Sequence, residues 1–289
     1  MVLRAGRVLA VAVVLALVGA GVSAVAATAA SRRSVVASFY PIAYAAQRVG
    51  GDRVHVTNLT PAGAEPHDLE LAPDQVDGLL DADVVFELGQ GFQPAVERAA
   101  EQRDRPTVTL LARGTKDPHN WLDPVQMQRI VRVVQHELTS TDPKGRAVYA
   151  RNAQRLLGQL GALDHRYADG LAHCQRRVIV TAHEAFGYLA RRYGLRQEGV
   201  AGVSPDSEPD ARRLGQLADL IKRTGATVVF TESLVDPRLA ETLAREAGVK
   251  TEALNPLEGL TDVELAHGAD YVTVMDENLA KLRGALGCS

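Results

Sequence analysis

The chain has 289 residues, a formal net charge of −3 and 46 % hydrophobic residues. This length suggests one large domain or two of about 110 to 150 residues, and this hydrophobic content excludes a largely disordered chain. The slight negative charge and the lack of a basic block argue against a nucleic-acid-binding protein.

The first thirty residues form a separate unit. Arg4 and Arg7 precede an uncharged apolar stretch of more than 20 residues, which ends in small-residue A-x-A sites. These features are typical of a secretory signal peptide, so we predict a signal peptide over residues 1–30, cleaved near Ala26 or Ala29. The alternative is an uncleaved membrane anchor, because the apolar stretch is long enough to span a bilayer. The segment contains no cysteine, so we expect a periplasmic or extracellular soluble protein without a lipid on an N-terminal cysteine.

Short β-rich runs alternate with helical patterns over the rest of the chain. The predicted strands cover residues 35–39, 54–59, 83–88 and 107–111 in the first half and 177–182, 195–201, 226–232 and 249–254 in the second. The segments between them, such as "PDARRLGQLADLIKR", carry apolar residues at helical spacing. Strands that alternate with helices predict an α/β fold with parallel sheets.

A long helix is predicted between the two halves. Residues 143–174 have apolar positions at helical spacing and no proline after Pro143, which predicts one helix of about 27 residues and about 40 Å. The halves also resemble each other, since "GLLDADVVFELGQGF" and "LIKRTGATVVFTESLVDP" both place a helix end, a buried strand and a polar loop in order. We therefore predict an N-terminal α/β lobe over 34–142, a linking helix over 143–174 and a C-terminal α/β lobe over 175–289.

Three of the eight histidines share one context. His67, His119 and His183 each follow the carboxyl end of a predicted parallel strand and precede a helix. Ligands bind at that edge of open α/β sheets. Three imidazoles that converge there favour Zn²⁺, which prefers neutral nitrogen ligands in a tetrahedral arrangement. The other five histidines are predicted to be ordinary surface residues: His55, His136, His165, His173 and His267.

A closed tetrahedral site needs a fourth ligand. The last predicted strand, 249–254, is followed by "LNPLEGL", whose only acidic residue is Glu258. Glu258 is therefore our first candidate. Asn255 is an alternative that offers an oxygen without a charge, and Glu65 is another, two residues before His67.

The two cysteines, Cys174 and Cys288, are predicted to form a disulfide. Export would place them in a compartment where disulfides persist. A thiolate metal site would need a cluster of cysteines, which the sequence does not contain. A Cys174–Cys288 bridge would close a loop of more than a hundred residues and contribute on the order of 4 kcal/mol in the chain-entropy model.

Five motifs carry a resemblance to a known family. They are "EPHDLELAPDQ", "DPHNWLDP", "TAHEAFGYLARRYGL", "SEPDARRL" and "YVTVMDENLAKLRGAL". With these motifs, nearly the whole mature chain resembles the metal-binding solute-binding proteins of ABC-type zinc and manganese uptake systems (cluster A-I), and its zinc-type members in particular.

The resemblance implies two α/β lobes, a long linking helix and a metal in the cleft between the lobes. It implies ligands at His67, His119 and His183 with a carboxylate from the C-terminal loop, and Zn²⁺ as the transported ligand. The implied partner is the permease subunit of an ABC importer. A zinc-donating chaperone is a second candidate partner, and a monomer without nucleic-acid partners is expected.

Three sequence details bear on the metal. Manganese-type relatives have glutamate at the position of His183, so this histidine points to zinc. Many zinc-type relatives carry a His-rich acidic loop before the second ligand, whereas "ARGTKDPHNW" is short and contains only His119. The C-terminal loop has Asn-Pro-Leu-Glu where an aspartate is often found, which leaves the fourth ligand open.

Trp121 and the prolines around His119 are interpreted as a rigid support that orients this imidazole.

Three rival functions remain open at this stage. One is a manganese-binding relative, and a second is a surface adhesin that binds zinc incidentally. The third is a secreted zinc hydrolase, because "HEAFG" begins like the H-E-x-x-H motif and places Glu184 beside His183. That motif fails at Gly187, where a second histidine is required. We therefore expect a binding protein and not an enzyme.

Overall fold

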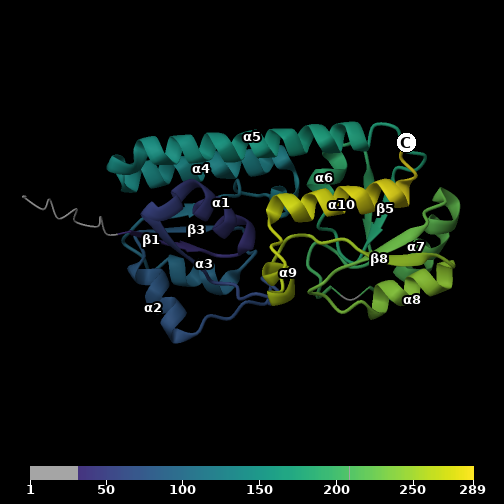
Figure 1. Cartoon of the computed structure of the whole chain (residues 1–289). Coiled ribbons are helices and arrows are strands. Elements are labelled where there is room, and N and C mark those ends of the chain that lie inside the picture. The colour runs from purple at the N-terminus through teal and green to yellow at the C-terminus, as the bar shows by residue number, and fades with distance from the viewer. Residues whose placement is uncertain (1–31, 208) are drawn as a thin grey trace, which may run out of the picture. The chain divides into compact units, whose positions relative to one another are not determined.

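Two four-stranded parallel sheets form the framework of the computed structural model, which describes residues 32–207 and 209–289 (Figure 1). The predicted signal peptide lies outside the described residues. The first sheet contains β1 (Arg33–Ala37), β2 (Val54–Asn58), β3 (Val84–Glu87) and β4 (Thr107–Thr109). The second contains β5 (Val178–Thr181), β6 (Arg196–Gly199), β7 (Val228–Thr231) and β8 (Lys250–Ala253).

The two sheets have the same topology. The first has the strand order β2-β1-β3-β4 and the second β6-β5-β7-β8, and neighbouring strands are parallel throughout. In each sheet the first strand pairs with the second and the third strand, so Ala37 of β1 is in register with both Asn58 of β2 and Phe86 of β3. The two strands inside the similar sequence segments, β3 and β7, occupy equivalent positions. The predicted α/β fold and all eight predicted strands are therefore confirmed.

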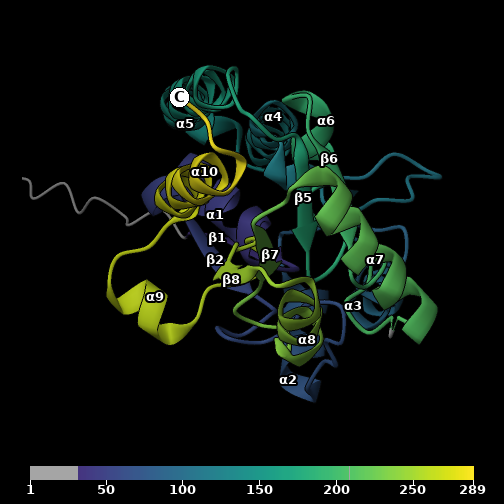
Figure 2. The same cartoon turned by 90° about the vertical axis from the view of Figure 1, so that its right-hand side faces the viewer.

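Helices connect and cover these strands. They are α1 (Tyr40–Gly50), α2 (Pro73–Asp81), α3 (Pro94–Ala100), α4 (Pro124–Thr141), α5 (Arg146–Gly170), α6 (Gly187–Arg192), α7 (Ala211–Thr224), α8 (Arg238–Ala247), α9 (Asp262–Ala266) and α10 (Tyr271–Leu286). Figures 1 and 2 show α4, α5 and α10 on one side of the strands and α2 and α8 on the opposite side. None of the helices within the described residues has the length and apolar composition needed to cross a membrane.

The long helix α5 has 25 residues and packs against α1 and α4 of the first half and α10 of the second. It begins at Arg146 because Pro143–Gly145 forms a separate 3₁₀ turn, and it ends at Gly170, before the predicted limit. The Arg166 guanidinium donates two hydrogen bonds, of 2.8 and 2.9 Å, to the Asp276 carboxylate of α10. The Tyr167 hydroxyl donates to the Met275 carbonyl at 2.7 Å. The helix therefore contacts both lobes along its length.

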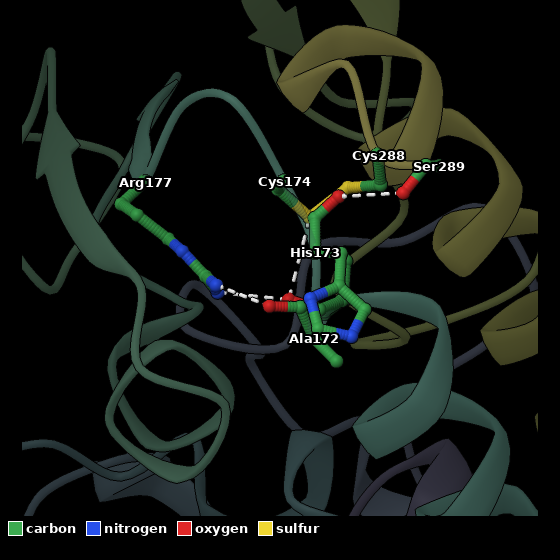
Figure 3. The surroundings of a disulfide bond; sticks show 7 residues. Ala172, His173, Cys174, Arg177, Cys288 and Ser289 are labelled. Atoms are coloured by element: carbon green, nitrogen blue, oxygen red, sulfur yellow. Dashed lines mark hydrogen bonds between the residues drawn. A yellow bond between two sulfur atoms is a disulfide. The ribbon is translucent and has the colours of Figure 1, made fainter.

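A disulfide between Cys174 and Cys288 joins the segment after α5 to the C-terminus (Figure 3). Backbone hydrogen bonds flank the disulfide on both sides. The Ser289 N–H donates to the His173 carbonyl at 3.0 Å, and the Arg176 N–H donates to the Leu286 carbonyl at 3.0 Å. The Arg177 guanidinium donates to the carbonyl of Ala172 at 2.6 Å, as Figure 3 shows. The end of α10 is thus fixed to the end of α5.

Candidate metal site

Four side chains converge from the carboxyl ends of four strands. His67 lies in the loop after β2, and His119 lies in the loop after β4. His183 follows β5 directly, and Glu258 lies in the loop between β8 and α9. Each sheet therefore contributes two side chains, and the site lies where the carboxyl ends of both sheets face each other, as expected for a ligand site in α/β folds.

The three imidazoles point their Nε2 atoms at one oxygen of Glu258. The distances to Glu258 Oε1 are 3.4 Å from His67, 3.0 Å from His119 and 3.3 Å from His183. The Nε2 atoms of His119 and His183 lie 3.3 Å apart, and one ligand atom from each of the four residues lies within 4.8 Å of every other. Three nitrogens and one carboxylate oxygen in this space form a donor set that suits tetrahedral Zn²⁺.

The site is almost fully buried. The side chains of His119, His183 and Glu258 are 0 % exposed, whereas that of His67 is 10 % exposed. The buried Glu258 Oε2 and His67 Nε2 form no hydrogen bond of ordinary geometry with any of the described residues. Because unpaired polar atoms are costly to bury, these atoms fit a role in holding a cation.

Two further carboxylates contact the far nitrogens of two imidazoles. Asp117 Oδ1 lies 3.0 Å from His119 Nδ1 and also accepts the His119 backbone N–H at 3.1 Å. Glu232 Oε2 lies 2.8 Å from His183 Nδ1, at an angle outside ordinary hydrogen-bond geometry, and Glu232 Oε1 accepts the His183 N–H at 3.2 Å. An ionised carboxylate only accepts hydrogen bonds, so both contacts favour a hydrogen on Nδ1 and leave Nε2 for a metal.

The same contacts change the pKa values of the two histidines. Burial lowers the pKa of His119, but its hydrogen bonds to Asp117 and Glu258 outweigh burial and raise the pKa above its ordinary value. Burial likewise lowers the pKa of His183, but the charges of Glu232 and Glu258 raise it well above the ordinary value. Without a metal, both imidazoles therefore retain protons that zinc must displace.

Glu258 is held as an ionised carboxylate. Burial raises its pKa, but the charge of His183 and the close contacts of the three imidazoles with its Oε1 bring the pKa well below its usual range. Its position is set by the preceding residues, because Asn255 Oδ1 accepts the Leu257 N–H at 2.7 Å and Leu257 has a left-handed φ of 58°. This turn directs Glu258 back into the site.

The two alternative ligands lie outside the group of four. The Asn255 side chain is used in other hydrogen bonds, since its Nδ2 donates to Glu264 of α9 at 2.9 Å. Glu65 Oε1 accepts the His67 N–H at 3.1 Å, so it supports the His67 loop. Burial and the charge of Glu258 raise the pKa of Glu65 to about 8, which favours its neutral form near pH 7.

An aromatic wall supports the imidazoles. The rings of Phe92 and His67 form a T-shaped pair with centroids 4.5 Å apart, and the Trp121 ring centroid lies 5.1 Å from that of His119. The Trp121 Nε1–H donates to the Pro256 carbonyl at 2.8 Å, two residues before Glu258. Trp121 therefore ties the loop that carries His119 to the loop that carries Glu258.

Sequence reasoning did not identify Asp117 and Glu232. Asp117 is only two residues before His119, so the D-P-H spacing was the available signal for it. Glu232 lies 49 residues after His183, and only the pairing of β5 with β7 brings it near. The five histidines predicted to lie on the surface are all exposed: His55, His136, His165, His173 and His267.

Comparisons with known proteins identify the family of this chain. Residues 35–285 match the ZnuA family, described as zinc-uptake complex component A, periplasmic. The zinc-binding lipoprotein AdcA of Streptococcus pneumoniae serotype 4 is 34 % identical over 275 residues, which cover 86 % of this chain and 55 % of AdcA. The high-affinity zinc uptake system protein ZnuA of Bacillus subtilis is 32 % identical over 277 residues, which cover 87 % of each chain. This chain thus spans about half the length of AdcA and most of the B. subtilis protein.

Solved structures are similar over the same region. The Zn(II)-bound ZnuA-like domain of S. pneumoniae AdcA has a TM-score of 0.77 and 34 % identity, with coverage of 88 % of this chain and 99 % of that domain. The laminin-binding protein Lmb of Streptococcus agalactiae, described as a bifunctional protein with adhesin and metal transporting activity, has a TM-score of 0.81 and 29 % identity. It covers 88 % of this chain, and the alignment includes 99 % of Lmb.

Proposed function

The chain belongs to the family of periplasmic A components of the zinc-uptake complex, and on that premise we propose that it captures Zn²⁺ outside the cytoplasm and delivers it to an ABC-type importer. The observation that carries this proposal is the convergence of three imidazole nitrogens on one carboxylate oxygen within a buried space. A site closed by four protein ligands binds zinc without leaving the open position that catalysis needs.

In this proposal His67, His119, His183 and Glu258 bind the metal. The three histidines are neutral when they coordinate, so Glu258 supplies the one negative charge among the ligands. Asp117 and Glu232 orient two of the imidazoles through Nδ1, as outer carboxylates do at other zinc sites. One chain supplies all four ligands, which supports a monomer as the working unit.

Zinc is the preferred cargo, and manganese is the weaker alternative. Zn²⁺ lies above Mn²⁺ in the Irving–Williams order, and imidazole nitrogen suits zinc, whereas manganese prefers oxygen ligands. Three of the four proposed ligands are nitrogens. The presence of His183 at the position where manganese-type relatives have glutamate therefore favours zinc.

Export and delivery complete the proposal. Residues 1–30 would direct the chain across the membrane, and the permease subunit of the importer would receive the metal. A zinc-donating chaperone is a further candidate partner. A binding role is favoured over hydrolysis because four protein ligands would leave no coordination position open for a catalytic water.

An adhesin role is the second candidate function. Its support is the similarity to Lmb, whose description includes adhesin activity. In this protein, an adhesin role would use the molecular surface. It would therefore exist beside metal binding, which takes place in a buried site.

Zinc uptake in cells tests the proposal. A bacterium without its own zinc-binding component would express this chain with its cognate permease and ATPase, and uptake of radioactive zinc would be measured at limiting zinc. We expect uptake with the wild type and with His136→Ala, a variant of an exposed histidine on α4. Loss of uptake is expected for His119→Ala. Equal uptake by His119→Ala and the wild type would contradict the proposal.

A further inference from the structure

A polar pocket lies at the end of the first sheet that is opposite to the metal site. Its volume is about 660 Å³, and it lies between the end of α1, the 3₁₀ turn Gly51–Arg53 and the first half of α5. The turn leads directly into β2 at Val54, whereas His67 follows the carboxyl end of the same strand. The pocket is therefore separate from the four metal ligands.

Arginine dominates the lining of this pocket. Four guanidinium groups line it, those of Arg48, Arg53, Arg151 and Arg155, and Asp52 is the only acidic residue among the described residues that line it. The whole chain, by contrast, has a formal net charge of −3. A concave surface that concentrates positive charge in this way attracts anions.

Two of the four arginines have structural partners. Arg53 Nε donates to Asp142 Oδ2 at 2.8 Å, and Arg53 Nη2 lies 2.6 Å from the same oxygen. Arg48 lies in the last turn of α1, where a cation interacts favourably with the helix dipole, and its Nη2 donates to Gln159 at 3.1 Å. These contacts account for both residues without a ligand.

Arg151 and Arg155 have no such partners. Both are exposed, and they lie four positions apart on the same face of α5, a spacing at which like charges destabilise a helix. The ion pairs and side-chain hydrogen bonds at the pocket, within the described residues, involve Arg48, Arg53 and Asn152 but neither of these two. The first turn of α5 contains no acidic residue that would offset their charge. An anion bound between the two guanidinium groups would remove this repulsion.

The segments around the pocket are held together by other contacts. Asn152 Nδ2 donates to the Val49 carbonyl at 3.1 Å, which joins α5 to α1. Gly51 has a left-handed φ of 54°, and a Cβ at this position would lie 3.1 Å from Asn152 Nδ2. The glycine therefore lets the turn approach α5 closely. The backbone of the pocket is thus fixed, whereas the exposed guanidinium groups of Arg151 and Arg155 remain available to a ligand.

We propose that this pocket binds a phosphate group through Arg151 and Arg155, with Arg48 adding positive charge. The planar guanidinium group donates paired hydrogen bonds that match the oxygens of a phosphate. A free phosphate and the head group of an anionic lipid share this chemistry. Lipid is a source to test because β1 begins at Arg33, in register with Val54, so the chain that follows the predicted signal peptide enters the fold at the same edge of the sheet. The inference is independent of zinc binding.

Titration with inorganic phosphate tests the shared chemistry. Calorimetry would compare the metal-free mature protein with a pocket variant, Arg151→Gln/Arg155→Gln, and a control variant, Arg129→Gln/Arg132→Gln, which removes two exposed arginines from α4. We expect the pocket variant to bind phosphate at least about tenfold more weakly than the wild type, and the control variant to bind it equally. Phosphate should raise the melting temperature of the wild type and the control variant more than that of the pocket variant.

Sedimentation with lipid vesicles distinguishes the two sources. Vesicles of phosphatidylglycerol would be compared with vesicles of neutral phosphatidylcholine for the same three proteins. Binding to phosphatidylglycerol that is lost only in the pocket variant would assign the site to a lipid head group, and phosphate binding without vesicle binding would assign it to a free anion. Absence of both, or equal binding by the pocket and control variants, would overturn the inference. Both variants should keep wild-type zinc affinity, so these results are separate from the test of zinc binding.

Discussion

Glu258 is the residue on which all three imidazoles converge. Its carboxylate is fully buried, its pKa lies well below the usual range, and its Oε1 lies 3.0 to 3.4 Å from each Nε2. A buried carboxylate surrounded by imidazoles is stable only when it faces protons or a metal. Its removal should therefore affect the site more than the loss of Asn255 or Glu65.

Glu258→Gln keeps the size of the side chain and removes its charge. We expect zinc affinity to fall by at least about 10- to 100-fold, the cost typical of changes to groups that surround a bound metal. Asn255→Ala and Glu65→Ala should cost less. The control is Glu277→Gln, an exposed change on α10, and competition titrations would compare the four variants. Wild-type affinity in Glu258→Gln together with a crippled Glu65→Ala would assign the fourth position to Glu65.

Zinc binding should depend on pH through His119 and His183. Their pKa values are raised in the folded, metal-free protein, so protons remain on these rings above the ordinary histidine pKa of about 6.5. The protonated rings stabilise the metal-free fold at low pH, and this contribution is lost as the pH rises through the raised pKa values. Zinc requires neutral rings, so its affinity should still increase above pH 7 and should fall steeply below about pH 6.

Calorimetry in buffers of different ionisation enthalpy would measure the protons released per zinc bound at pH 7. We expect a net release of protons. No release at pH 7, together with equal affinity at pH 5 and pH 8, would show that the imidazoles are not the ligands.

Some of these residues could be predicted from sequence, and others could not. The three histidines could, because each follows a recognisable strand and the carboxyl ends of parallel strands meet at one edge. Glu232 could not, because its role depends on the pairing of β5 with β7 and on a side-chain direction that spacing does not define. The choice among Glu258, Asn255 and Glu65 as the fourth ligand also required the structure, because all three lie in irregular loops whose conformation the sequence does not define.

At the level of elements, hydrogen bonds to Trp121 connect the His119 loop to the C-terminal lobe. The Trp121 Nε1–H donates to the Pro256 carbonyl, and the Trp121 carbonyl accepts the hydroxyl of Tyr271 at the start of α10. The sequence suggested that Trp121 makes this loop rigid. In the structure, Trp121 forms hydrogen bonds with the loop of Glu258 and with α10.

Tyr271→Phe tests this connection. The change keeps the ring and leaves the buried Trp121 carbonyl without its donor, which should lower the free energy of unfolding of the metal-free protein by about 1–3 kcal/mol. The control is Tyr44→Phe, because the Tyr44 ring stacks on Tyr271 but its buried hydroxyl has no hydrogen-bond partner in the part of the chain that the structure describes. Urea unfolding would measure both. If Tyr44→Phe destabilises as much as Tyr271→Phe, the hydroxyl of Tyr271 does not support the loop.

Element positions were easier to predict than element ends. Seven of the eight strands fall within their predicted ranges, and only β1 begins two residues earlier, at Arg33. The short helix α9 was not predicted, because five residues are too few to show a helical period. The reciprocal side-chain bonds between Thr261 and Glu264 at its start, a capping box, were the signal that identifies it.

On the scale of the whole molecule, α5 and the disulfide hold the two lobes together. The largest hydrophobic cluster includes residues of both lobes, among them Trp121 and Tyr271. The sequence predicted two lobes and a linking helix, but it did not predict that one core continues from one lobe into the other. That continuity depends on the packing of α10 against α5, which no periodic pattern specifies.

Loss of the disulfide should lower stability without changing the metal site. The bridge joins residues 114 positions apart, for which the chain-entropy model gives about 4–5 kcal/mol. Replacement of Cys174 and Cys288 by alanine should therefore lower the free energy of unfolding by about this amount. Zinc affinity at 25 °C should remain that of the wild type, since neither cysteine contacts the four site residues. A large loss of zinc affinity in a folded double variant would show that the junction shapes the site.

Metal analysis of the purified mature protein, combined with a competition titration of zinc against manganese, tests the central claim most directly. We predict one Zn²⁺ per chain, a higher melting temperature with zinc, and an affinity for zinc far above that for manganese. Stabilisation should reach roughly 4 kcal/mol at a free zinc concentration a thousandfold above Kd. A protein that binds no zinc, or that binds manganese as tightly as zinc, would contradict the account.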